Sequence, residues 1–164
     1  MTVPFGRLLG PALEALTLFE SGKTLDAAVG ASLTDSRMRP ALQAVLYDLT
    51  RRYFLCDCLV QFLSARPPTD NVRRILMLAL SELLLYPTKR FALVNETVNF
   101  AKANRKTSAA SGFVNACLRR FCRESDALVA EAMKNDIVRL NAPEWLLKKF
   151  SQDLGRTDAE ALLK

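Results

Sequence analysis

The stretch RRILMLALSELL, residues 73–84, contains the longest uninterrupted apolar run of the chain and decides the fold. Its leucine and isoleucine side chains cover most of the circumference of a helix instead of a single stripe, which is typical of a buried helix. The capping residues Thr69 and Asp70 precede this stretch and Pro87 follows it. The sequence therefore predicts a central helix between these points, with other helices packed around it.

Apolar residues recur every three or four positions along most of the remaining chain, and no stretch alternates in the manner of a half-buried strand. The sequence therefore predicts an all-α fold. One long amphipathic helix is expected before the central helix, and two helices after it are expected to bury Phe91, Val94, Val98 and Phe113. The predicted helices around the central one cover about residues 5–20, 25–33, 41–65, 90–103, 109–122 and 124–140, and another unit starts at 143–154.

The overall composition indicates a globular protein. The chain has 164 residues, and half of them are hydrophobic, which is enough for one domain with a buried core. It lacks the run of about 20 apolar residues that a membrane helix needs. Residues 1–13 also lack the basic start and apolar block of a secretory signal. We therefore expect a cytoplasmic location and no membrane partner.

The cysteines and the absence of histidine restrict the possible chemistry. Neither Cys56 with Cys58 nor Cys117 with Cys122 has the two-residue spacing that lets neighbouring thiolates bind one zinc ion. Histidine is the commonest general base and the usual partner of a catalytic serine or cysteine. We therefore expect four reduced thiols in or near the core, no metal site and no catalytic residue.

The positive charge is concentrated in the middle of the chain. The formal net charge is +6, but residues 37–123 contain 15 lysines and arginines against five acidic residues. After Arg123 there are six basic and eight acidic residues. Such a basic segment is a candidate surface for a polyanion, because neutralised phosphates release counterions on binding. A solvated basic face without a ligand is the alternative.

Two segments of the chain carry a family resemblance. LVNETVNFAK, residues 93–102, followed by GFVNACL, residues 112–118, resembles the paired signature of the NusB family, which is helical and binds RNA. Residues 73–83 and 46–52 are similar to the central helix of that family and the helix before it. The resemblance covers about residues 5–122 and implies a NusB-like helical bundle with extra C-terminal helices.

Two further segments resemble the amino-terminal part of bacterial ribosomal RNA (cytosine-5) methyltransferases of the Fmu, Sun or RsmB type. The first is VNACLRRF, residues 114–121, with its two basic residues after the leucine. The second is NAPEWLLKKF, residues 141–150, which is similar to the segment that connects the NusB-like domain to the methyltransferase domain. Ala142 stands where that family usually has histidine. The resemblance implies a NusB-like RNA-binding domain at 1–123 and connecting helices at 124–164.

Enzymes of that type use S-adenosylmethionine and a pair of cysteines in a carboxy-terminal domain. This sequence offers neither a glycine-rich cofactor loop after a strand nor a Pro-Cys or Thr-Cys dipeptide for the nucleophile. We therefore expect a fragment that is not catalytic alone, from a parent enzyme that binds S-adenosylmethionine in an absent domain. The resemblance implies ribosomal RNA and that catalytic domain as its partners.

Two alternative functions stay open from the sequence. A free-standing antitermination factor of the NusB type would act together with a ribosomal protein, although such proteins usually end before the Trp145 segment. A helical protein-interaction module would carry its basic face only incidentally.

Candidate RNA-binding residues are the basic pairs and clusters of the middle segment, because the planar guanidinium group suits bidentate contact with phosphate. Neighbouring residues on a helix point about 100° apart, so usually only one member of a pair can join a common patch. We expect Asn95, Glu96 and Asn115 to form structural hydrogen bonds and Trp145 to pack against neighbours. The predicted RNA-binding residues are Arg7, Arg51, Arg52, Arg73, Arg74, Lys102, Arg105, Lys106, Arg119, Arg120 and Arg123.

Overall fold

The computed structural model describes residues 3–163, and within this range the regular structure is entirely helical. The all-α prediction is therefore confirmed. Short 3₁₀ turns η1 (Ser36–Met38), η2 (Pro87–Lys89) and η3 (Ser108–Ala110) precede α3, α6 and α7. The α-helices are α1 (Phe5–Glu20), α2 (Leu25–Ser32), α3 (Arg39–Thr50), α4 (Tyr53–Leu63), α5 (Asp70–Leu85), α6 (Arg90–Ala103), α7 (Ser111–Ala132), α8 (Asp136–Leu140), α9 (Glu144–Leu154) and α10 (Arg156–Leu163).

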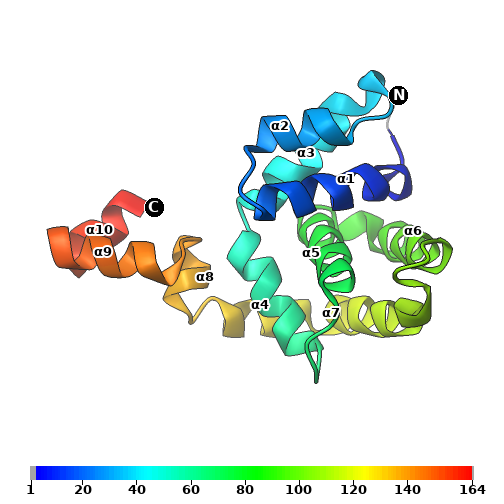
Figure 1. The fold of residues 1–164 in the computed structure, drawn as a ribbon. Helices are drawn as coiled ribbons and strands as arrows, with labels where there is room; N and C mark the ends of the chain where they lie inside the picture. The colour runs from blue at the N-terminus through cyan, green and yellow to red at the C-terminus, as the bar shows by residue number, and fades with distance from the viewer. Residues whose placement is uncertain (1–2, 164) are drawn as a thin grey trace.

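Helix α5 is the centre of the bundle, as its sequence predicts. It contacts α1, α3, α4, α6 and α7, which surround it in Figure 1. Every side chain from Ile75 to Leu80 is fully buried, and so is Leu83. Because burying one large aliphatic side chain contributes about 1.5–3 kcal/mol, this helix supplies a large part of the hydrophobic stabilisation.

The helix predicted at 41–65 is in fact two helices, α3 and α4. The chain breaks at Arg52, whose φ of −129° and ψ of 23° are not helical. The side chain of Asn141 bridges this break: its Nδ2 donates to the Thr50 carbonyl at 2.9 Å, and its Oδ1 accepts from the Phe54 backbone N–H at 3.3 Å. Two backbone groups freed by the break are therefore satisfied from about 90 residues away.

Helix α7 is longer than the segment 109–122 that periodicity predicts. It continues to Ala132 across a kink at Glu124, where φ is −120° and ψ is 19°. No proline or glycine stands near this point to end the helix, so the chain bends and resumes helical geometry. The domain boundary predicted between residues 123 and 124 coincides with the kink, and the boundary itself stays a prediction.

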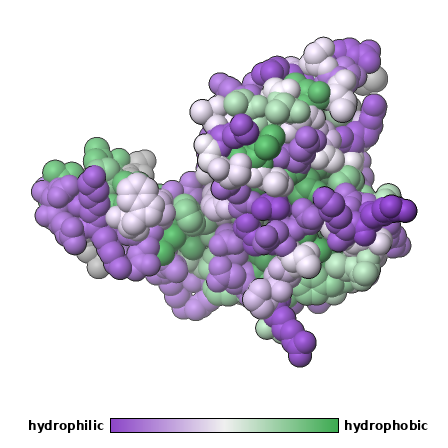
Figure 2. Space-filling view, in the orientation of Figure 1, coloured by the Kyte–Doolittle hydropathy of each residue, from purple (hydrophilic) through white to green (hydrophobic). Residues whose placement is uncertain are grey.

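Helices α9 and α10 pack against each other and project from the bundle as a C-terminal arm (Figure 1). Trp145 at the start of α9 is 66% exposed, so the prediction that it packs against neighbours is wrong for the described residues. The face seen in Figure 2 carries apolar surface that hydrophilic side chains break up. No helix in the range 3–163 is both long and apolar enough to cross a membrane.

Candidate nucleic-acid interface

Arg73 and Arg74 belong to a buried polar cluster between α1 and α5. Arg73 Nη2 donates to Glu20 Oε2 at 2.5 Å, and Arg74 Nε donates to Glu20 Oε1 at 2.6 Å. Arg73 also contacts Asp57 at 3.2 Å, and the Tyr53 hydroxyl donates to Glu20. The arginine side chains are only 23% and 15% exposed. Both guanidinium groups are therefore engaged inside the protein, which argues against the prediction that they contact RNA.

The ionisation of the cluster follows from these contacts. Burial acts to raise the pKa of Glu20, but hydrogen bonds from Tyr53, Arg74 and Arg73 outweigh it and hold this pKa below its ordinary value. Burial and the hydrogen bond to Glu20 raise the pKa of Tyr53 to about 12. The carboxylate therefore stays charged and the phenol stays neutral near neutral pH.

Several other predicted residues are scattered or engaged within the protein. Arg51 lies 3.7 Å from Asp48, and Arg52 is half-buried and donates to the Asp48 carbonyl. Arg120 pairs with Glu124 at 2.8 Å and reaches the Phe62 carbonyl. The remaining exposed members lie at the start of α1 and in the link between α6 and α7: Arg7, Arg105 and Lys106.

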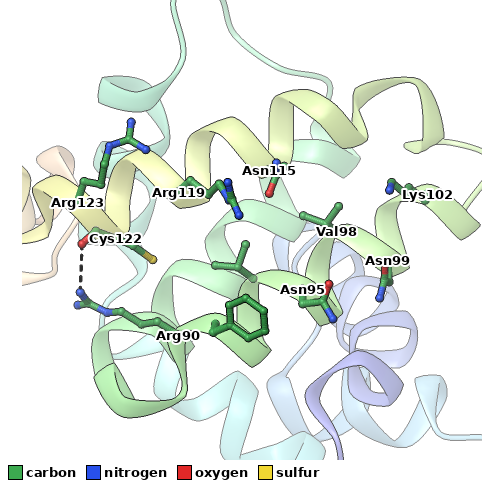
Figure 3. Close-up of a pocket in the computed structure, with 11 residues that line it drawn as sticks. Arg90, Asn95, Val98, Asn99, Lys102, Asn115, Arg119, Cys122 and Arg123 are labelled. Carbon is green, nitrogen blue, oxygen red and sulfur yellow. Dashed lines mark hydrogen bonds between the residues drawn. The ribbon is translucent and has the colours of Figure 1, made fainter.

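A groove of about 500 Å³ between α6 and α7 brings together the three predicted residues that remain, Lys102, Arg119 and Arg123. Successive turns of α6 direct one face toward it, and α7 contributes residues spaced by four, three and one. Figure 3 shows Asn115 and Arg119 of α7 leaning toward α6. The groove is lined by Arg90, Phe91, Val94, Asn95, Val98, Asn99 and Lys102 of α6 and by Asn115, Arg119, Cys122 and Arg123 of α7.

The groove is positively charged and contains no acidic residue. Lys102, Arg119 and Arg123 are exposed, and within the described part of the chain none of them forms an ion pair or a side-chain hydrogen bond. Arg90 differs from them because it is half-buried and reaches the Cys122 carbonyl at 3.5 Å (Figure 3). It also lies 3.4 Å from Ser125 Oγ. Arg90 therefore ties α6 to α7, whereas the other three cations are available to a ligand.

The polar amides of the groove are also available. Asn95 and Asn99 are exposed and Asn115 is half-buried, and the structure gives none of their side chains a hydrogen bond within residues 3–163. The structural hydrogen bonds predicted for Asn95 and Asn115 are therefore not present. Each amide has two donors and an acceptor to offer. The groove combines fixed positive charge with groups that can pair with polar edges.

The sequence pattern predicts that Phe91 is buried in the core, and this prediction is wrong. The side chain is 84% exposed and lines the groove. Val94 and Val98 are half-buried: they pack against the core, as predicted, and also line the groove. Phe113, also predicted to be buried, is 37% exposed. An exposed aromatic ring beside cations is typical of surfaces that stack nucleic-acid bases. The available signal was that Phe91 precedes Asn95 by four residues, which places the two side chains on the same face of α6.

Glu82 of α5 is a second unusual polar residue and lies outside this groove. It is 7% exposed, and its Oε1 atom is buried without a hydrogen-bond partner in the described structure. Burial, together with the charge of Asp48, raises the pKa of Glu82 to about 7. An unpaired buried carboxylate of this kind destabilises the folded protein when it ionises.

Stability is therefore expected to fall between pH 5 and pH 8. Because the folded pKa of Glu82 lies above the ordinary 4.5, the folded protein binds more protons than the unfolded chain in this window, and its free energy of unfolding decreases by about 2 kcal/mol as pH rises. The absence of histidine leaves few other groups to titrate there. Urea denaturation at several pH values measures this, and a Glu82→Gln variant with the same slope would contradict it.

Comparison with known proteins places this geometry in a family. Residues 12–123 match the NusB family. The chain is similar to the ribosomal RNA small subunit methyltransferase B of Escherichia coli O1:K1, with 33% identity over 114 residues, covering 68% of this chain and 26% of the relative. The corresponding protein of Serratia proteamaculans is 32% identical over 155 residues, covering 85% of this chain and 35% of the relative.

The alignments cover most of this chain but only part of each relative. This chain spans about a quarter to a third of the length of these curated relatives. The Serratia alignment also covers more of this chain than the segment 12–123. An all-helical bundle around α5, together with the match over residues 12–123, gives the conclusion that this chain belongs to the NusB family.

Proposed function

We propose that this domain binds RNA through the groove between α6 and α7, as the substrate-recognition module of a ribosomal RNA (cytosine-5) methyltransferase. The observation that carries the proposal is the set of three unpaired cations, Lys102, Arg119 and Arg123, in a groove without acidic residues. Uncompensated cations attract phosphate, and the unpartnered amides and the ring of Phe91 offer contacts to bases. The similarity to small-subunit methyltransferases supports ribosomal RNA as the ligand.

The catalytic step belongs elsewhere in this proposal. The described residues form only helices, so they offer no strand-to-helix turn of the kind that commonly cradles nucleotide-like cofactors. In this proposal none of the described residues is assigned to S-adenosylmethionine. The parent protein would bind that cofactor in a separate catalytic domain, which is the proposed protein partner of this module. Its ribosomal RNA substrate makes the cytoplasm the proposed location.

A salt titration tests whether the groove binds RNA electrostatically. We expect the association constant for a small-subunit ribosomal RNA transcript to fall with salt, with a slope of log K against log salt of about −2 to −3 for three neutralised phosphates. Fluorescence anisotropy between low and physiological salt measures this slope. An affinity that does not change with salt would rule out phosphate contact by these cations. The same titration with poly-glutamate shows whether any polyanion is sufficient.

A further inference from the structure

A second cavity, of about 540 Å³, lies on the side of the bundle formed by α1, α3 and the ends of α5 and α6. Its walls are largely apolar and include Phe5, Leu8, Val45 and Leu93. Glu82 also lines it, with more than nine-tenths of its surface buried and one oxygen without a partner. The cavity therefore combines an apolar wall with an unsatisfied acidic group.

Two more acidic residues line the cavity, Asp48 from α3 and Glu96 from α6. Tyr86 stands beside them and is 42% exposed. Together these groups favour a positively charged ligand.

The cations around Glu82 are turned to other partners. Arg37 binds Asp35 through two hydrogen bonds of 3.1 and 3.0 Å. Lys89 Nζ lies 5.3 Å from the centre of the Tyr86 ring. Arg52, which acts on Glu82 only at longer range, donates to the Asp48 carbonyl. In the described structure no cation forms an ion pair with Glu82.

We propose that this cavity binds a primary ammonium group on an aliphatic stem, with the ammonium group at Glu82 and the stem along the apolar wall. An ammonium group carries three donors and a full charge, so it can satisfy a carboxylate on which Arg52 and Lys89 act only at a distance, without an ion pair. Tyr86, whose ring already contacts Lys89, lines the mouth of the cavity. The described residues contain no group of three acids or thiols placed to hold a metal ion, so an organic cation fits this cavity better.

The same ammonium chemistry comes from two sources, a free polyamine or a lysine side chain of a protein partner. We test both with spermidine and with Nα-acetyl-lysine methylamide, titrated into the chain at pH 8 by isothermal calorimetry. Saturable binding of either probe supports the site and identifies its source. Absence of saturable binding by both probes at low-millimolar concentration would overturn the proposal.

Two variants locate the binding. Glu82→Gln removes the charge with little change of shape, and we expect at least a tenfold weaker affinity. Ala44→Trp fills the mouth from α3 without altering Glu82 and should also abolish binding. Glu14→Gln, at an exposed position on α1, is the matched control and should bind the amine as tightly as the unmodified chain. If the Glu82→Gln and Ala44→Trp variants bind the amine as tightly as the unmodified chain, the assignment is wrong.

The ammonium site is independent of the RNA groove. Failure of amine binding leaves the salt dependence of RNA binding unchanged, so the two proposals are tested separately. Because the ammonium group needs an ionised carboxylate, we also expect weaker amine binding at pH 5.5 than at pH 8. Asp48 raises the pKa of Glu82, whereas Arg52 and Lys89 lower it. The other charged or titratable groups that line the same cavity are Glu96, Tyr86 and Arg37.

Discussion

Replacing Glu20 by leucine is expected to lower the free energy of unfolding by about 3–5 kcal/mol, because removal of one partner leaves buried charge uncompensated. Arg73 and Arg74 both donate to this carboxylate, and both are mostly buried. Without it the two guanidinium groups lie next to each other with only Asp57 nearby, and Tyr53 loses its acceptor. Urea denaturation followed by circular dichroism measures the loss.

The control is Glu14→Leu, at an exposed position on the same helix. It should change the free energy of unfolding by less than about 0.5 kcal/mol, as surface substitutions usually do. The triple variant Glu20→Leu, Arg73→Leu, Arg74→Leu should recover much of the loss, since apolar groups can replace a buried ion pair at little cost. A single-variant loss below about 1 kcal/mol would show that water, not Glu20, solvates the arginines.

The central helix could be predicted because its information is local. Six consecutive apolar residues, Ile75–Leu80, leave no polar face, so any compact arrangement must bury them. The break between α3 and α4 could not be predicted in this way. Its backbone groups are satisfied by Asn141, which is distant in sequence, and the periodic pattern of apolar residues continues through the break.

The roles of the charged residues also depend on contacts between positions that are distant in sequence. Sequence counts place Arg73 and Arg119 in one basic segment, but their surroundings differ completely. Arg73 meets Glu20 from 53 positions away, whereas Arg119 lines a groove without acidic residues. Phe91 was misplaced for a related reason: apolar residues occupy several faces of α6, so periodicity alone does not identify the buried one.

The arginines therefore have two different roles, which their number alone does not distinguish: some form contacts inside the protein, and others are free to bind a ligand. Arg73, Arg74 and Arg90 hold helices together through contacts inside the protein. Arg119 and Arg123 have no such contacts in the described structure and lie on one face of α7. Substitutions in the first set should reduce stability, and substitutions in the second should reduce binding with little effect on folding.

Reversing the three unpaired charges of the groove, with Lys102→Glu, Arg119→Glu and Arg123→Glu, is expected to weaken RNA binding by about 100-fold or more. The change removes three phosphate contacts and adds three negative charges to the same groove. Fluorescence anisotropy with the small-subunit ribosomal RNA transcript measures the affinity. The salt dependence should also become shallower, because fewer counterions are released on binding. The free energy of unfolding should stay nearly constant, since all three side chains are exposed.

The matched control reverses three exposed cations outside the groove, with Lys23→Glu, Arg39→Glu and Arg66→Glu, and so produces the same change in net charge. If the whole basic field of the chain attracts RNA, the two triple variants lose affinity equally. If the groove is the binding site, the control loses only the long-range part of the attraction, which salt screens beyond about 10 Å at 0.1 M. Equal losses at physiological salt would therefore remove the groove from the proposal, whereas a large difference assigns RNA contact to the α6–α7 surface.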